Sequence, residues 1–323
     1  MEYRTLGRTG VKVSPLCLGC MNFGDPTDER ESIRIIERAL DAGINFVDTA
    51  NVYNKGTSEE IVGKALRGKR DRVVLATKVH GRMGDGPNDR GNSRYHITRQ
   101  VEASLRRLQT DRIDLYQLHR PDPDTPMDEQ LGALTDLVRQ GKVLYIGTST
   151  FPACTLCESL WISESRHLER FVCEQPPYSI LCRRIEQDVL PFCRERGFGV
   201  IPWSPLCGGW LTGKYRKGKD LPAGSRGSRH GWDTASEAGQ RRLDVVEQLM
   251  DAIEDEETPG ATLSQFSLAW LLQQPGVTTP IIGPRTAEQL EDNLGALDIT
   301  LSPQALERVD AAVPPGTDLM GYS

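Results

Sequence analysis

Short apolar runs recur along the chain, and longer stretches with helical spacing lie between them. Each run holds four to six mostly apolar residues, which is typical of a strand covered on both faces. These runs predict strands at Pro15–Leu18, Asn45–Asp48, Val73–Thr77, Ile113–Leu118, Val143–Thr148, Arg170–Glu174, Gly199–Pro202 and Thr278–Ile282. Between them, apolar residues recur every three or four positions, as at Leu131, Leu134 and Leu137, which predicts helices that cover the strands.

The alternation of strand and helix, repeated about eight times, indicates an α/β fold. A closed (β/α)8 TIM barrel, with parallel strands inside a ring of helices, accounts for this order. The length of 323 residues would also allow two domains. A doubly wound sheet, however, needs a Gly-x-Gly-x-x-Gly turn after its first strand, and Gly19 and Gly24 have the wrong spacing. We therefore expect one barrel domain over residues 1–323.

Two segments, residues 80–95 and 205–235, are longer than ordinary loops and rich in glycine and polar residues. Both follow predicted strands, so both should lie on the C-terminal face of the barrel, where long loops are usually functional. We expect them to act as lids and to set substrate choice. Residues 262–273 predict a further amphipathic helix, and Ser302 predicts the N-cap of a last helix that ends at Ala312.

The chain carries 39 Lys and Arg residues against 45 Asp and Glu residues, a formal net charge of −6. This mild acidity argues against a nucleic-acid or membrane-surface partner, because both need clustered basic residues. No apolar run approaches the roughly 18 residues of a membrane span, and the first residues lack the apolar core of a signal peptide. We expect a cytoplasmic protein. The sequence leaves the oligomeric state open.

Eight cysteines raise the question of a metal site, because two pairs, Cys17 with Cys20 and Cys154 with Cys157, have C-x-x-C spacing. The pairs lie far apart, and the first begins in a predicted strand, where a three-residue offset places the side chains on opposite faces. We predict reduced thiols and no metal site. Cys20 should lie at the mouth of the barrel, where thiol reagents would modify it.

Acid–base residues follow three consecutive predicted strands. Asp48 ends the second strand, Lys78 follows the third, His119 follows the fourth, and Tyr53 lies five residues beyond Asp48. Each alone has an ordinary structural explanation, such as a helix cap or a hydrogen-bonded core residue. In a barrel, however, the carboxyl ends of the strands meet at the active site. We therefore expect all four side chains to converge there.

Together these groups suit protonation of an oxygen while hydride reaches the carbon bonded to it. An ammonium group beside a phenol lowers its pKa from about 10, so Lys78 would tune Tyr53. A buried lysine needs a counter-charge, which Asp48 supplies. A neutral imidazole at His119 would donate a hydrogen bond to a carbonyl oxygen. No metal is needed, but a hydride carrier is.

The segments that carry these residues resemble the signatures of the aldo-keto reductases. They are Asp48-Thr-Ala-Asn-Val-Tyr53, Ala76-Thr-Lys78 and Asp114-Leu-Tyr-Gln-Leu-His119, and the resemblance spans nearly the whole chain. It implies an N-terminal β-hairpin that closes the bottom of the barrel. It also implies that Tyr53 donates the proton, that Lys78 and Asp48 tune it, and that His119 orients the substrate.

The resemblance further implies a nicotinamide cofactor bound in an extended form without a Rossmann fold. Ser149, Thr150 and Gln175 match the contacts to the carboxamide, and Trp203 matches the aromatic residue that stacks on the nicotinamide ring. The matching positions for the pyrophosphate and the adenosine are Ser204, Leu206, Gly208, Lys214, Gly283, Arg285, Gln289 and Asn293. Arg285 would meet a 2′-phosphate, which favours NADPH over NADH.

Two segments differ from known sequence patterns at one position each. Thr150 stands where the family commonly has asparagine, and a hydroxyl cannot replace the paired donor and acceptor of an amide. The loss would weaken one cofactor contact by roughly 1 kcal/mol. Residues 208–214 also fit the Gly-x4-Gly-Lys pattern, but Tyr215 stands where a P-loop needs Ser or Thr, so we expect no triphosphate site.

We therefore expect an NADPH-dependent reductase that converts an aldehyde or ketone into an alcohol. One alternative narrows the small-molecule substrate to a keto-sugar or a natural-product intermediate, because loop 80–95 and Arg120 are polar. Another is a cofactor-binding regulatory subunit with negligible turnover, for which the departure at Thr150 is the sequence support.

Overall fold

In the part of the chain that the structure describes, the central sheet has eight strands, and all neighbouring strands in it are parallel. The computed structural model describes residues 1–255 and 260–322. The strands follow the spatial order β10-β3-β4-β5-β6-β7-β8-β9. Their bounds are β3 (Cys17–Gly19), β4 (Phe46–Asp48), β5 (Val74–Val79), β6 (Ile113–Leu118), β7 (Val143–Ser149), β8 (Cys173–Gln175), β9 (Gly199–Val200) and β10 (Ile281–Ile282).

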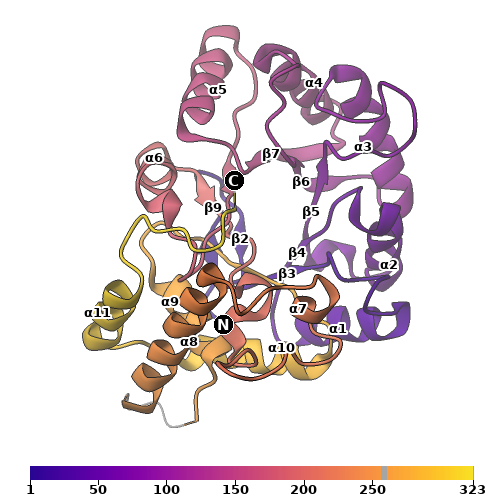
Figure 1. Ribbon diagram of the computed structural model, residues 1–323. Coiled ribbons are helices and arrows are strands. Elements are labelled where there is room, and N and C mark those ends of the chain that lie inside the picture. The colour runs from indigo at the N-terminus through magenta and orange to yellow at the C-terminus, as the bar shows by residue number, and fades with distance from the viewer. Residues whose placement is uncertain (256–259, 323) are drawn as a thin grey trace.

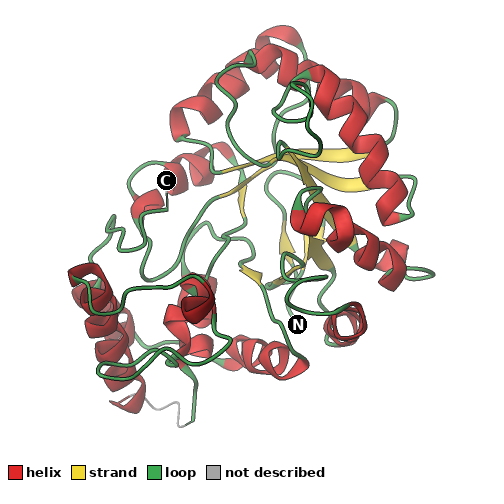
Figure 2. Ribbon diagram, turned by 45° about the vertical axis from the view of Figure 1, so that its right-hand side comes forward, coloured by secondary structure: helices red, strands yellow, loops and turns green. Residues whose placement is uncertain are grey.

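Hydrogen bonds join the two edges of this sheet and close it. The Thr278 N–H donates to the Val200 carbonyl, and the Ile281 N–H donates to the Pro202 carbonyl, both at 2.8 Å. Helices surround the strands on the outside (Figures 1 and 2). The predicted (β/α)8 barrel is therefore confirmed. The strands are shorter than expected at β8, β9 and β10, where regular pairing covers only two or three residues.

Helices alternate with the strands along the chain. The α-helices are α1 (Glu29–Asp41), α2 (Thr57–Ala65), α3 (Arg94–Leu108), α4 (Met127–Arg139), α5 (Ala153–Arg166), α6 (Val189–Arg196), α7 (Arg226–Arg229), α8 (Glu237–Asp255), α9 (Leu263–Gln273), α10 (Ala287–Leu294) and α11 (Pro303–Ala312). Short 3-10 helices are η1 (Tyr53–Gly56), η2 (Arg70–Arg72), η3 (Arg184–Glu186), η4 (Cys207–Thr212) and η5 (Gly295–Asp298).

Local chemistry explains several helix ends. The Ser302 hydroxyl accepts a hydrogen bond from the Ala305 N–H, so the predicted cap of α11 is confirmed. Gly197 ends α6 with φ of 71°, a left-handed conformation that costs a glycine little. Helix α9 occupies the predicted segment, but it is buried on nearly all sides instead of being amphipathic, because α8, α10 and η5 pack around it.

An N-terminal hairpin closes the bottom of the barrel, as the family resemblance implied. Strands β1 (Arg4–Thr5) and β2 (Lys12–Val13) pair antiparallel. Leu6 and Val13 are fully buried, and they pack in one cluster with the interior barrel residues Phe46 and Leu115. The Arg4 guanidinium donates to the Leu272 carbonyl at 2.9 Å, which ties the hairpin to the end of α9.

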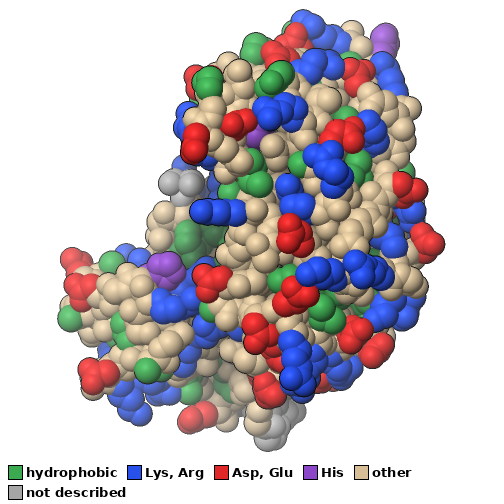
Figure 3. Space-filling view, turned by 90° about the vertical axis from the view of Figure 1, so that its right-hand side faces the viewer, with side chains coloured by type: hydrophobic (Ala, Val, Ile, Leu, Met, Phe, Trp, Pro, Cys, Tyr) green, Lys and Arg blue, Asp and Glu red, His purple; other side chains and the backbone are tan. Residues whose placement is uncertain are grey.

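The outer helices carry many ion pairs. Figure 3 shows basic and acidic side chains intermingled on one face of the molecule. Exposed examples are Lys64 with Glu29 at 2.9 Å and Arg94 with Asp136 at 2.5 Å. Exposed pairs of this kind contribute roughly 0–1 kcal/mol each, so the barrel depends mainly on its apolar core.

Among the described residues, none of the helices combines the length and the hydrophobicity of a membrane-spanning segment.

Glu174 on β8 is fully buried and supports the turn that follows β7. Its carboxylate accepts hydrogen bonds from the Thr148 hydroxyl at 2.5 Å and from the Phe151 N–H at 3.1 Å. Burial raises the pKa of Glu174 to about 7, although these hydrogen bonds oppose the shift. Ser149 and Thr150 lie between the two donors, so Glu174 holds their backbone at the upper end of the barrel.

Glycine at position 63 allows α2 to approach α3 closely. A Cβ atom there would lie 2.6 Å from the carbonyl oxygens of Arg107 and Leu108. We predict that Gly63→Ala lowers the free energy of unfolding by about 1–3 kcal/mol, because backbone atoms cannot move aside as a side chain can. Urea unfolding measures the effect. The matched control is Gly132→Ala on α4, where the Cβ meets only the mobile end of Arg94 at 3.0 Å, so stability should stay equal or rise.

The pKa of Glu174 predicts a pH-dependent stability. The folded-state pKa of about 7 lies above 4.5, so the folded protein holds the proton more tightly between these pH values. Its contribution to stability is complete below pH 4.5 and is lost as the pH rises through 7. Relative to the native protein, Glu174→Gln should therefore become more stable with rising pH, by a change on the order of 3 kcal/mol. Urea unfolding at pH 5 and pH 8 tests this, and an equal difference at both would contradict it.

Candidate active site

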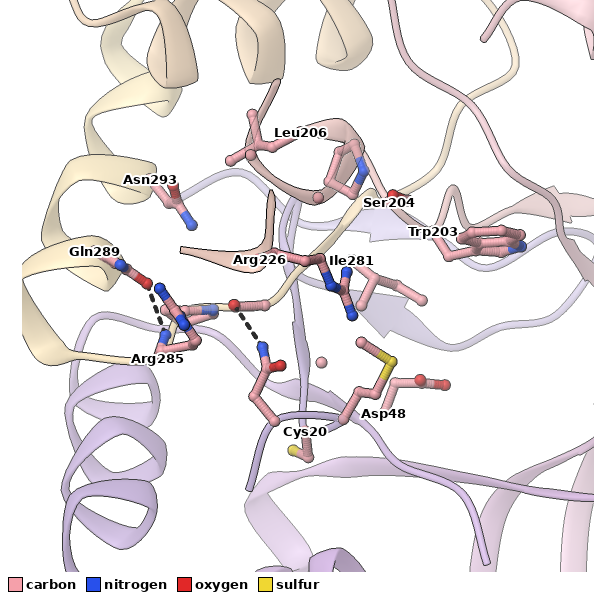
Figure 4. A pocket seen from close by; sticks show the side chains of 18 of the residues that line it. Cys20, Asp48, Trp203, Ser204, Leu206, Arg226, Ile281, Arg285, Gln289 and Asn293 are labelled. Atoms are coloured by element: carbon pink, nitrogen blue, oxygen red, sulfur yellow. Dashed lines mark hydrogen bonds between the residues drawn. The ribbon is translucent and has the colours of Figure 1, made fainter. Parts of the chain in front are cut away.

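A pocket opens at the carboxyl ends of the strands, as Figure 4 shows from close by. It extends from Tyr53 and His119 to α10, and most of the residues predicted for the site line it. Those lining residues are Asp48, Tyr53, His119, Ser149, Gln175, Trp203, Ser204, Leu206, Gly208, Lys214, Gly283, Arg285, Gln289 and Asn293. Lys78 and Thr150 are the predicted residues that do not line it.

A buried ion pair lies under the catalytic end of the pocket. The Lys78 ammonium, which is fully buried, binds the Asp48 carboxylate and donates to the Thr49 carbonyl at 2.9 Å. It also lies 3.4 Å from the Tyr53 hydroxyl, to which it donates. The ring of Tyr53 meets that of His119 nearly at right angles, with centroids 5.6 Å apart. The structure therefore brings all four predicted acid–base residues together.

Neighbouring amides fix the other oxygen of Asp48. Gln117 and Gln175 each donate an amide hydrogen to Asp48 Oδ2, at 3.1 and 3.0 Å. The ion pair and its amide partners thus come from β4, β5, β6 and β8. Because Asp48 has partners on both oxygens, its carboxylate stays oriented toward Lys78 and is not free to act as a base toward a substrate.

The pKa shifts at this end favour one set of protonation states. Burial raises the pKa of Tyr53; Lys78 lowers it, as expected, but offsets only part of the rise. Burial lowers the pKa of Lys78, but Asp48 and Tyr53 outweigh it, and the net shift is upward. Burial, together with the charges of Lys78 and Arg120, holds the pKa of His119 well below its usual value. Near pH 7, Tyr53 is therefore a neutral phenol, Lys78 an ammonium and His119 a neutral imidazole.

Beside these groups, the turn after β7 faces Trp203. Ser149 lines the pocket, and its hydroxyl donates to the Gln175 carbonyl at 2.9 Å. Thr150 has a left-handed backbone, with φ of 63°. Its hydroxyl accepts hydrogen bonds from the Trp203 indole at 3.4 Å and from Arg120 at 3.3 Å. Thr150 thus contacts the residues that line the pocket rather than lining it.

The opposite end of the pocket is strongly basic. Lys214, Arg226, Arg229 and Arg285 all line it. Burial, then the neighbouring cations, lowers the pKa of Lys214 and of Arg285. Such mutual repulsion is relieved when an anion binds among the cations. Arg226 and Arg229 were not predicted from the sequence, although two arginines in a Gly-rich loop near the predicted phosphate-binding residues could have indicated them.

Hydrogen bonds and aromatic packing hold this basic end in place. The Gln289 side chain accepts from the Arg285 N–H at 2.8 Å (Figure 4). Loop 205–235 crosses over to it, since the Arg285 guanidinium donates to the Gly224 carbonyl at 3.3 Å. Trp232 from this loop stacks on Trp210, with centroids 5.3 Å apart and planes 9° apart. Loop 205–235 therefore forms one wall of the pocket, as expected for this loop.

The other long loop does not contribute to the pocket. Residues 80–95 are absent from its lining. Buried Asn92 draws this loop onto the turn after β6, because its side chain donates to the Arg120 carbonyl at 2.9 Å and its N–H donates to Asp122 at 2.7 Å. The expectation that loop 80–95 covers the site is therefore wrong.

Among residues 1–255 and 260–322, no cluster of three or more His, Cys, Asp or Glu side chains could hold a metal ion. Cys20 lies at the pocket, as expected, but it is fully buried, and burial raises the pKa of its thiol well above the usual value. It is therefore a poor target for thiol reagents.

Comparison with known proteins agrees with this geometry. A model of the Aldo/keto reductase family matches residues 15–314. The chain is 45% identical to an uncharacterized oxidoreductase, YrpG, of Bacillus subtilis, over 97% of this chain and 96% of that protein. It is 38% identical to a putative voltage-gated potassium channel subunit beta of Schizosaccharomyces pombe, over 96% and 92% of the two chains. It is also 34% identical to the versiconal hemiacetal acetate reductase of Aspergillus parasiticus, over 98% of each.

The range matched by the family model covers nearly the whole barrel and includes the positions of all four acid–base residues. The family generally uses nicotinamide cofactors and acts on small carbonyl compounds. The chain therefore belongs to the aldo/keto reductase family of oxidoreductases.

Proposed function

We propose that this protein reduces an aldehyde or ketone to an alcohol, with NADPH as the hydride donor and Tyr53 as the proton donor. The observation that carries the proposal is the contact of the Tyr53 hydroxyl with the buried Lys78–Asp48 pair, beside a neutral His119 in a pocket. When bound, a reduced nicotinamide supplies hydride to the carbonyl carbon.

The protein's own groups handle the oxygen and its proton. The raised pKa of Tyr53 keeps the phenol protonated near neutral pH, so it is ready to donate to the carbonyl oxygen. Its neighbour Lys78 stabilises the phenolate left behind, and Asp48 keeps that ammonium charged. The neutral His119 is a hydrogen-bond donor suited to orient the same oxygen.

The proposed cofactor would lie along the pocket. Ser149 and Gln175 would bind the carboxamide, and Trp203 would stack on the nicotinamide ring. Thr150 would act through Trp203, whose indole it already binds. The stretch with Ser204, Leu206, Gly208 and Lys214 would cover the pyrophosphate, and Gly283, Arg285, Gln289 and Asn293 would hold the adenosine.

The basic end of the pocket supports NADPH over NADH. Its four cations outnumber the negative charges of a pyrophosphate and of Asp292 together, Asp292 being the acidic side chain among the described residues that line this end. A 2′-phosphate near Arg285 would balance the remaining positive charge. We place this reaction in the cytoplasm, which stays a prediction.

Two alternatives keep some support. The name of the Aspergillus parasiticus relative, a reductase of versiconal hemiacetal acetate, favours a natural-product intermediate as the substrate. The name of the Schizosaccharomyces pombe relative, a channel subunit beta, favours a regulatory role. Oxidation of NADPH by a panel of carbonyl compounds separates them, because a purely regulatory subunit would bind NADPH without turnover.

We predict that Tyr53→Phe lowers kcat for aldehyde reduction by at least 100-fold, because a positioned general acid contributes about 10²–10⁴. The ring and its packing remain, so NADPH affinity should stay within about threefold. Steady-state absorbance of NADPH and titration of its fluorescence measure the two quantities. Undiminished turnover in Tyr53→Phe would contradict the assignment of the proton donor.

We predict that Arg285→Ala raises the KM for NADPH by about tenfold to 100-fold, because a charged hydrogen bond contributes about 1.5–3 kcal/mol. The KM for NADH, which lacks the 2′-phosphate, should change much less and serves as the internal control. Equal increases for both cofactors would show that Arg285 binds a part that the two share.

A further inference from the structure

Arg120 is a cation at the catalytic end of the pocket that the proposed reaction does not use. It directly follows His119 after β6, is partly buried, and lines the pocket together with Tyr53 and His119. Its charge acts on both groups, since it lowers the pKa of His119 and opposes the upward shift of Tyr53. Arg120 therefore lies close to where a carbonyl group would react.

The Arg120 guanidinium is held by only one of its nitrogens. Nη1 donates to the His119 carbonyl at 2.7 Å and to the Thr150 hydroxyl at 3.3 Å. The group also lies over the Trp203 ring, 5.7 Å from its centroid. Within the described part of the chain, Nε and Nη2 donate to no protein acceptor, and no carboxylate forms an ion pair with Arg120. A fixed guanidinium with a free edge matches the two oxygens of a carboxylate.

Charge balance along the pocket argues that this edge does not serve the cofactor. Four cations already lie at the opposite end, where the phosphates of a dinucleotide would bind. A nicotinamide ring becomes positively charged when it loses hydride, so a cation beside it is unfavourable unless an anion lies between them. Of the described carboxyl groups near Arg120, Asp48 is neutralised by Lys78. Glu174, on which the charge of Arg120 acts, is bound to the Thr148 hydroxyl and the Phe151 N–H and forms no ion pair with Arg120. The missing anion would therefore come with the substrate.

We propose that Arg120 binds the carboxylate of the substrate, and that the protein reduces aldehydes or ketones that carry a carboxylate. The inference rests on the proposed carbonyl reduction. In the reaction, hydride adds to the carbonyl carbon, the Tyr53 proton adds to the oxygen, and the carboxylate is unchanged. Met21, an exposed apolar residue of the pocket lining, provides apolar surface for the body of such a substrate.

Two substrates of nearly equal shape test the proposal. 4-Carboxybenzaldehyde carries the charge, and methyl 4-formylbenzoate is its neutral ester. We expect kcat/KM to be about tenfold to 100-fold higher for the acid, as for a charged hydrogen bond. The ester is the more electrophilic aldehyde, so intrinsic reactivity works against this result. Benzaldehyde, which lacks both groups, completes the set.

Substitution of Arg120 separates recognition of the carboxylate from support of the fold. In Arg120→Gln the ratio of the two kcat/KM values should fall to about one, whereas a structural role would lower both values together and leave the ratio unchanged. Arg120→Lys, which keeps the charge but loses the planar edge, should give an intermediate ratio. The control Arg90→Gln removes an exposed arginine outside the pocket and should retain the full ratio.

The outcomes distinguish this inference from the proposed function. Equal kcat/KM for the acid and the ester in the native protein, with clear turnover of both, overturns the role of Arg120 and leaves carbonyl reduction intact. A retained ratio in Arg120→Gln also overturns it. No NADPH oxidation with any of the three aldehydes overturns the proposed reduction and the inference with it.

Discussion

The ion pair between Lys78 and Asp48 is the interaction on which the site depends. Removing two charges from water costs several kcal/mol per ion, and a buried pair rarely repays this as stability. Here Asp48 also accepts from Gln117 and Gln175, on two further strands. The pair therefore forms only when the barrel is closed around it. Its benefit is chemical, since it places a permanent ammonium beside the Tyr53 hydroxyl.

The sequence predicted the barrel and the convergence of its acid–base residues because both follow from local patterns. Apolar runs mark strands, and parallel strands bring their carboxyl ends together wherever the intervening helices lie. The path of the long loops does not follow from a local sequence pattern. Loop 80–95 does not line the pocket but packs on the turn after β6, because Asn92 binds Asp122, Gln130 and Arg120, which are far away in sequence. Periodicity carries no information about that network.

Burial explains the other differences between expectation and structure. The sequence places an ammonium near a phenol, which alone would lower the pKa of Tyr53, but only the fold shows that desolvation outweighs it. Cys20 was expected at the pocket and lies there, yet its thiol is fully buried. Thr150 was aligned with a cofactor contact, but its left-handed backbone directs the hydroxyl toward Trp203 and Arg120. In each case the residue type indicated a place in the site, but its burial or backbone conformation could be known only from the fold.

The charges along the pocket also make its two ends different. The chain as a whole is acidic, with a net charge of −6, whereas the far end of the pocket gathers Lys214, Arg226, Arg229 and Arg285. A concave basic site in an acidic protein attracts anions, because its shape concentrates the electric field of the cations. The phosphates of a dinucleotide would therefore bind at that end, and the length of the cofactor would bring its nicotinamide toward Tyr53. The charge distribution of the pocket would thus select one orientation of such a cofactor before any contact with the nicotinamide ring is made.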